Sequence, residues 1–167
     1  MKIIYPGSFD PFTKAHEALC RRVLAFADEL VILFAENQEK NSYYSLKERM
    51  AFAYTALKDC DKIKIDSCPG LLADYFRESQ ADAVLRGLRN TNDLQYEQSM
   101  AEANRLLCPN LETVLLLSWP EHSWMSSSLA RELASFGAPL EAILPKAVIE
   151  AHSKELYRHC KDRGEKE

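Results

Sequence analysis

Short apolar runs alternate with amphipathic stretches of helical length along most of this chain, and that alternation limits the possible folds more than any other feature. It is typical of a parallel sheet, because neighbouring parallel strands need a long, usually helical, connection. The helices are expected at residues 14–28, 45–58, 69–79 and 93–107. The predicted strands are Lys2–Tyr5, Leu30–Phe34, Lys62–Asp66, Ala83–Leu85 and Thr113–Leu117.

After the fifth strand the pattern stays helical. One helix is expected over Ser126–Phe136, where Gly137 stops it, and another from Pro145, since proline suits a first helical turn. We therefore predict an α/β fold with one doubly wound, five-stranded parallel sheet and C-terminal helices, in a single domain over residues 1–160. Residues 161–167 are expected to form a charged, frayed tail. Such sheets bind ligands at the carboxyl ends of their strands, where the strand order reverses.

Composition and charge narrow the classes of partner. The chain is 47% apolar and 28% charged, which is typical of a globular protein, and its net charge of −4 argues against nucleic acid and acidic membranes. No apolar run reaches the ~18 residues of a membrane span, and the N-terminal run is too short for a signal peptide. We expect a cytoplasmic protein. The five cysteines contain no C-x-x-C pair and are read as free thiols.

The turn after the first strand has the composition of a phosphate site. Gly7 lets the backbone approach a ligand closely, and the stretch Thr13–His16 opens the first helix, whose N-terminus attracts anions. The same residues also fit a plain turn in which Asp10 or Thr13 caps the helix and His16 is a surface residue. Both interpretations stay open on this segment alone.

Three further segments with phosphate-binding chemistry follow other strands. The guanidinium groups of Arg86 and Arg89 can fork onto phosphate oxygens, or form ion pairs with Asp93 or Glu97. The run Ser126–Ser128 can bind an anion through backbone N–H groups, or simply cap a helix. Lys40 lies in a polar loop, where lysine is usually only solvated. Together with Arg131, the basic residues Lys40, Arg86 and Arg89 can form a cleft for a small polyanion.

Four candidate phosphate-binding elements, each after a different strand, should converge on one edge of the sheet. The chain lacks the motifs G-x-x-x-x-G-K-[ST], G-x-G-x-x-G, G-x-S-x-G and H-E-x-x-H. Kinase-type P-loop proteins, dinucleotide oxidoreductases, serine hydrolases and metalloproteases are therefore disfavoured.

These residues resemble the nucleotidylyltransferase superfamily, which is marked by a [HT]-x-G-H motif, and within it the bacterial phosphopantetheine adenylyltransferase family. The resemblance extends over almost the whole chain. It is carried by residues 5–11, Leu46 to Arg49, residues 70–75, Arg86 to Arg89, Asp93 with Tyr96 and Glu97, Asn104 with Arg105, and Ser126 to Leu129 with Glu132. It implies a Rossmann-like fold and transfer of AMP from ATP to 4'-phosphopantetheine, giving dephospho-coenzyme A and pyrophosphate.

The resemblance also implies roles for particular residues. The catalytic residues would be His16, Lys40, Arg86 and Arg89. The acceptor would be bound by Ser8, Lys40, Leu72 and Arg86. ATP would be bound by Ser8, Phe9, His16, Gly87, Leu88, Arg89, Glu97, His122, Ser123, Trp124, Met125, Ser126, Ser127 and Ser128. Magnesium is expected with ATP, without a dedicated metal site in the protein, and a homohexamer is expected. This chain has Ala15 where the family has glycine before the histidine.

The acceptor phosphate is already anionic, so the expected mechanism is in-line attack on the α-phosphorus without a covalent enzyme intermediate. His16 would donate to an α-phosphate oxygen. Three alternatives remain: a sister transferase with another acceptor, a nucleotide-binding sensor or scaffold without catalysis, and a nucleic-acid-binding module, which the acidic charge disfavours.

Overall fold

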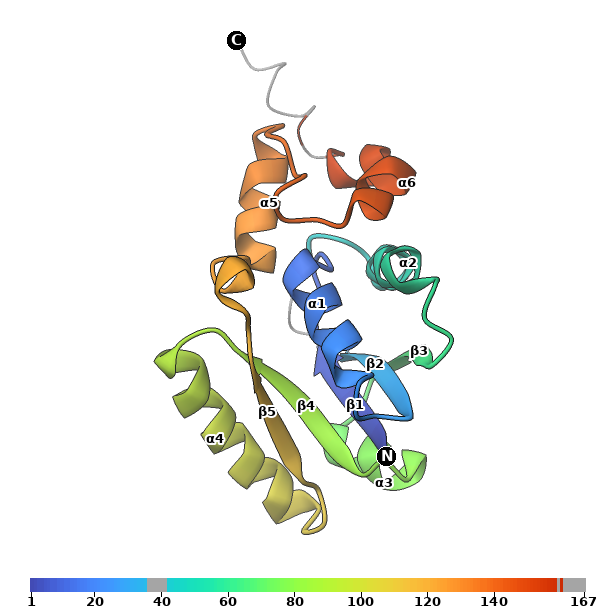
Figure 1. Cartoon of the computed structure of the whole chain (residues 1–167), viewed down its shortest axis with the longest axis vertical. Helices are drawn as coiled ribbons and strands as arrows, with labels where there is room; N and C mark the ends of the chain where they lie inside the picture. Colours follow the sequence, from blue (N-terminus) through green and yellow to red (C-terminus); the bar gives the residue numbers. More distant parts are fainter. Residues whose placement is uncertain (36–41, 159, 161–167) are drawn as a thin grey trace.

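The computed structural model describes residues 1–35, 42–158 and 160. Strands and helices alternate through Leu117, and the rest of the described chain is helical (Figure 1). The strands are β1 (Lys2–Gly7), β2 (Glu29–Ala35), β3 (Ile63–Cys68), β4 (Ala83–Leu88) and β5 (Thr113–Leu117). The helices are α1 (Lys14–Val23), α2 (Leu46–Leu57), α3 (Leu72–Ser79), α4 (Thr91–Leu107), α5 (Ser127–Ser135) and α6 (Lys146–Leu156), with a short 3₁₀ turn, η1 (Pro120–His122).

The strands form one sheet in the order β3-β2-β1-β4-β5, and every described pair is parallel. The chain moves outward from β1 to β3, then crosses back to place β4 on the other side of β1. The strand order therefore reverses between β1 and β4, whose carboxyl ends lie side by side. The predicted doubly wound parallel sheet is confirmed, and its switch point is where a ligand is expected.

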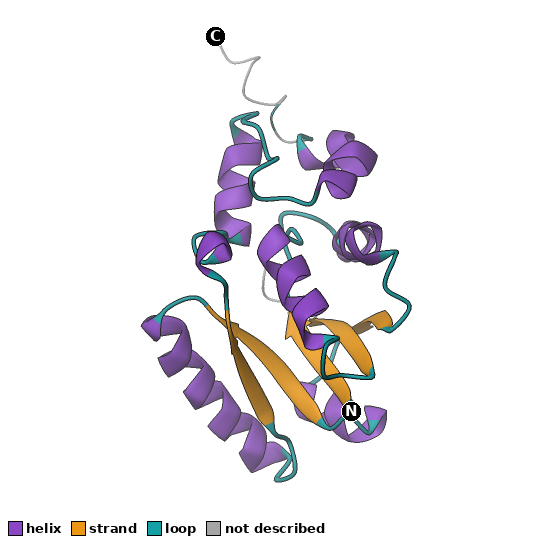
Figure 2. Ribbon diagram, in the orientation of Figure 1, coloured by secondary structure: helices purple, strands orange, loops and turns teal. Residues whose placement is uncertain are grey.

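Helices cover both faces of the sheet (Figure 2). Strand residues alternate between two hydrophobic cores, one on each face. Ile3, Ile32 and Leu85 pack on the face covered by α1, α2, α5 and α6. Ile4 and Val84 pack on the opposite face, against α3. Burial on both faces explains why the central strands β1 and β2 read as nearly continuous apolar runs, whereas the edge strand β3 alternates between apolar and polar residues.

Several element boundaries differ from the predicted ones. β4 continues through Leu88, because its pairing with β5 extends to Leu88 opposite Leu117, and β1 continues to Gly7 opposite Phe34. Arg86 and Gly87 thus lie in the strand and not after it. α1 ends at Val23, earlier than expected.

α4 is attached to the sheet by a small part of its surface. Only Glu97 is buried among its residues, and Tyr96, Met100, Leu106 and Leu107 are exposed. β5, the edge strand beside it, exposes Leu115 and Leu117. Within the described ranges, no helix is both long and apolar enough to cross a membrane.

Candidate active site

A cavity of about 350 Å³ lies at the carboxyl ends of β1 and β4, at the switch point of the sheet. Its volume is at the lower end of the range of small-molecule sites. It is lined by residues from β1 and the following turn, α1, β4, α4, Ser118 and the N-terminus of α5. They are Tyr5, Pro6, Gly7, Ser8, Phe9, Ala15, His16, Leu19, Arg86, Gly87, Arg89, Asp93, Glu97, Ser118, Met125, Ser126, Ser127 and Ser128.

His16 is held by a capping box at the start of α1. The Thr13 hydroxyl accepts from the backbone N–H of His16, and the Thr13 N–H donates to His16 Nδ1 at 3.0 Å. A glutamate or glutamine usually takes the place that the imidazole has here. Of the two predicted caps, Thr13 is therefore the one that forms, and the cap orients the ring of His16.

The environment of His16 keeps its ring neutral. Phe9 and Phe12 surround it, with ring centroids 5.1 and 5.5 Å away. Burial, with a smaller contribution from the charge of Arg89, lowers the pKa of His16 to about 4. Because Nδ1 accepts a hydrogen bond, the neutral ring carries its hydrogen on Nε2. His16 therefore provides a neutral N–H donor at the cavity.

Arg86 is fixed by a forked ion pair. Its Nε and Nη2 donate to the two carboxylate oxygens of Glu97 at 2.6 and 2.7 Å, and Nη1 donates to the Pro6 carbonyl at 2.8 Å. The Glu97 side chain is 8% exposed and that of Arg86 27%. Burial would lower the pKa of Arg86, but the bonds and charge of Glu97 outweigh it and raise that pKa. Arg86 thus joins β4 to both β1 and α4.

Arg89 makes a second fork, one helical turn away on α4. Its Nε and Nη2 donate to Asp93 at 3.0 and 3.1 Å, and its backbone N–H donates to the same carboxylate at 2.9 Å. Burial would raise the pKa of Asp93, but these bonds lower it. Since its side chain is 39% exposed, Arg89 is more open to an incoming anion than Arg86.

The three serines at the start of α5 have different hydrogen bonds. Ser126 is the N-cap and accepts from the Leu129 N–H at 3.1 Å. The Ser127 hydroxyl donates to the Pro11 carbonyl at 2.9 Å, and the Ser128 hydroxyl accepts from Arg131 at 3.1 Å. The three hydroxyls thus stabilise the fold, and the Leu129 N–H is used by the Ser126 cap, whereas the N–H groups of Ser127 and Ser128 have no acceptor within the helix. Those backbone groups are the anion donors that α5 supplies.

The cavity brings together most of the residues predicted from the sequence, but not all. Leu88 is buried but does not line the cavity, and Leu72 packs against the hydrophobic core beneath α3. His122 stacks on Trp119 and lines a different cavity, beside the outer face of α1. Ser123 and Trp124 also lie outside the lining. Lys40 lies outside the described residues.

Sequence reasoning assigned no individual role to four of the lining residues, Tyr5, Pro6, Leu19 and Ser118. Leu19 follows Ala15 and His16 at helical spacing of four and three residues, so the periodicity of α1 could have placed it on the same face. Tyr5 and Ser118 carry no comparable signal, because only the sheet register brings their strand ends to the cavity.

Both carboxylates at the cavity are already paired, Asp93 with Arg89 and Glu97 with Arg86. In the described part of the chain no cluster of three or more His, Cys, Asp or Glu side chains is arranged to hold a metal ion. A magnesium ion here would depend on oxygen ligands from a bound nucleotide, which is the usual arrangement for magnesium with phosphates.

Known proteins that resemble this chain have folds and activities that fit a phosphate-binding cavity at this position. Residues 4–133 match the family described as cytidylyltransferase-like. A crystal structure from Vibrio parahaemolyticus, provisionally described as a nicotinate-nucleotide adenylyltransferase, superposes with a TM-score of 0.70 over 94% of both chains. At 14% identity this shows a common fold only. Fold and cavity together define a nucleotidylyltransferase.

Curated relatives narrow the family further. The phosphopantetheine adenylyltransferase of Thermotoga neapolitana is 41% identical over 97% of this chain and 98% of its own length. That of Alkaliphilus metalliredigens is 39% identical over 92% of this chain and 99% of its own. The chain belongs to the phosphopantetheine adenylyltransferase family.

Proposed function

We propose that this protein transfers AMP from ATP to 4'-phosphopantetheine, which gives dephospho-coenzyme A and pyrophosphate. The observation that carries the proposal is the cavity at the β1/β4 switch point, where a neutral histidine donor, two arginines and a helix N-terminus meet. The family membership, over nearly the full length of the relatives, supports the choice of acceptor.

In this reaction an acceptor phosphate oxygen forms a bond to the α-phosphorus of ATP, and the bond from that phosphorus to the bridging oxygen breaks. Pyrophosphate leaves with the electron pair. No general base is required, because the acceptor oxygen is anionic at neutral pH. The Nε2–H of His16 stabilises the charge that builds on the α-phosphate, as a preorganised donor does elsewhere.

The other groups of the cavity bind and orient the substrates. Arg89 and the first turn of α5 are suited to the β- and γ-phosphates, and Arg86 and Lys40 to the acceptor phosphate. Magnesium would enter on the triphosphate and neutralise part of its charge. A cytoplasmic location remains a prediction from the sequence.

A homohexamer also remains a proposal, and exposed apolar side chains support self-association. Tyr96 is 61% exposed, Leu106 86% and Leu117 68%, on α4 and the adjoining edge strand. Sedimentation equilibrium tests this: Leu117→Asp should shift the wild-type hexamer to smaller species, and a monomeric wild-type protein would contradict it.

The decisive assay mixes the purified protein with ATP, magnesium and 4'-phosphopantetheine and follows the release of pyrophosphate. Nicotinate mononucleotide as acceptor, and CTP with glycerol phosphate, serve as parallel reactions for sister transferases. Release of pyrophosphate only in one of those reactions would contradict the proposal. ATP binding without turnover on any acceptor would indicate a sensor.

A further inference from the structure

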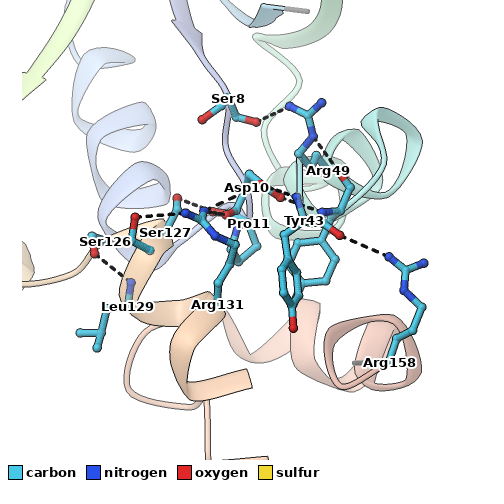
Figure 3. Close-up of polar contacts among 12 residues, drawn as sticks. Ser8, Asp10, Pro11, Tyr43, Arg49, Ser126, Ser127, Leu129, Arg131 and Arg158 are labelled. Atoms are coloured by element: carbon cyan, nitrogen blue, oxygen red, sulfur yellow. Dashed lines mark hydrogen bonds and ion pairs between the residues drawn. The ribbon is translucent and has the colours of Figure 1, made fainter. Parts of the chain in front are cut away.

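The turn between β1 and α1 is held from outside the cavity by side chains of other helices (Figure 3). Arg49 of α2 donates to the Ser8 carbonyl at 2.6 Å, and Arg131 of α5 donates to the Asp10 carbonyl. Neither arginine lines the cavity. Two carbonyl groups of the turn therefore point toward cations outside the site, and not toward the position of a bound phosphate, which they would repel.

The carboxylate of Asp10 is part of the same network. Its side chain is 10% exposed and accepts from the backbone N–H groups of Tyr43 and Tyr44, both at 2.9 Å. Arg131 Nη1 lies 3.8 Å from Asp10 Oδ2. A buried carboxylate two residues from Ser8 would disfavour a polyanion in the cavity, and the guanidinium offsets that charge.

Arg131 also acts on its own helix. Its Nη2 donates to the Ser128 hydroxyl at 3.1 Å, while Ser127 donates to the Pro11 carbonyl at 2.9 Å. The same guanidinium thus contacts the phosphate-binding turn and the first turn of α5. These are two separate anion-binding elements, and their spacing must match the phosphates of one nucleotide.

We propose that Arg131 is a positioning residue for the nucleotide: through Asp10 and Ser128 it sets the distance between the β1–α1 turn and the N-terminus of α5. Sequence reasoning placed Arg131 among the basic residues of the cleft, whereas its contacts place it behind the turn. The inference rests on the proposed function in one respect, that the nucleotide is ATP.

The test compares wild type with Arg131→Met and Arg131→Lys, with Arg77→Met as the matched control. Arg77 is an exposed arginine on α3 that pairs only with Asp74 among the described residues. The measurements are the Kd for ATP with magnesium by calorimetry, the binding stoichiometry, the melting temperature and the turnover number. ATP binding needs no acceptor, so it remains informative even if 4'-phosphopantetheine is not the substrate.

We expect Arg131→Met to weaken ATP binding about 10- to 100-fold, the effect of losing charge-assisted hydrogen bonds. Arg131→Lys should lie between it and wild type, because lysine keeps the charge but not the fork. Arg77→Met should bind ATP within about 2-fold of wild type, as an exposed pair contributes little.

A purely structural role would lower the melting temperature and the stoichiometry but leave the Kd of the folded fraction unchanged, and that result would overturn the proposal. If Arg131→Met does not fold, Arg131→Lys decides: wild-type affinity in that variant overturns the proposal, and weaker binding supports it. Failure of wild type to release pyrophosphate with normal ATP binding would overturn only the proposed acceptor.

Discussion

Replacing His16 in two different ways separates its role in the fold from its role in the reaction. His16→Gln keeps an acceptor for the Thr13 N–H, because glutamine is a normal partner in a capping box. It replaces the rigid imidazole Nε2–H that faces the nucleotide with the N–H of a flexible carboxamide, which is not preorganised. His16→Ala removes both the acceptor for the Thr13 N–H and the donor.

The magnitudes follow from these contacts. Loss of a preorganised donor costs about 3–4 kcal/mol in the transition state, so both variants should lose roughly 100- to 1000-fold in turnover. His16→Ala also loses the reciprocal half of the capping box, the Thr13 N–H bond to the imidazole, and part of the packing against Phe9 and Phe12, together about 2 kcal/mol of stability. For a chain of this length, that lowers the melting temperature by about 4–8 °C. His16→Gln should melt within about 3 °C of wild type.

The assay follows pyrophosphate release at saturating ATP and acceptor, with melting curves on the same samples. His152→Gln, a histidine that contacts Phe52 between α2 and α6, is the matched control and should keep wild-type turnover. Wild-type turnover in His16→Ala would refute the assignment of a transition-state donor. Loss of activity only in His16→Ala would indicate that the cap, or a carboxamide N–H in place of the imidazole N–H, is sufficient.

Three further predictions concern the surroundings of His16. In an NMR titration the His16 ring should show a midpoint near pH 4. Because this pKa is below that of a histidine in the unfolded chain, about 6.5, protons bind the unfolded state more tightly, and stability is lost as the pH falls from about 6.5 to about 4. A titration midpoint near 6.5 would refute the argument that burial lowers the pKa. Glu97→Gln leaves Arg86 without its charge partner and should lower the free energy of unfolding by about 2 kcal/mol in a urea titration. Loss of a partner from a fully buried pair would cost more, but the Arg86 side chain is 27% exposed. An unchanged urea midpoint would show that the ion pair does not stabilise the fold. Ala15→Gly removes a methyl group from the cavity wall, so it should lower the Kd for ATP, measured by calorimetry, while it lowers the stability of the helix by about 1 kcal/mol. Weaker ATP binding would contradict the interpretation that this methyl group crowds the nucleotide.

The sheet could be predicted from the sequence because each strand is a short apolar run and each crossover a helical stretch. Strand ends could not, since they depend on partners: β4 continues through Leu88 only because Leu117 lies opposite. The cavity was predictable to the extent that parallel strands bring their carboxyl ends together.

The partners of individual side chains were not predictable. Arg131 reads as one more cation of an anion-binding cleft, and nothing local indicates that it donates to Asp10, 121 positions away in the chain. The sequence left two interpretations for Arg86 and Arg89, phosphate binding or ion pairing. In the structure they line the cavity and form ion pairs as well.

The capping box at His16 has an evolutionary consequence. Glutamine at this position would also complete the box, without burying a charge, so the fold would accept it with little loss, yet it would take away the rigid imidazole donor that faces the nucleotide phosphates. Selection for stability alone therefore does not retain the histidine. A lineage released from selection for the reaction could lose its chemistry at this site in one substitution and still inherit a fully folded protein.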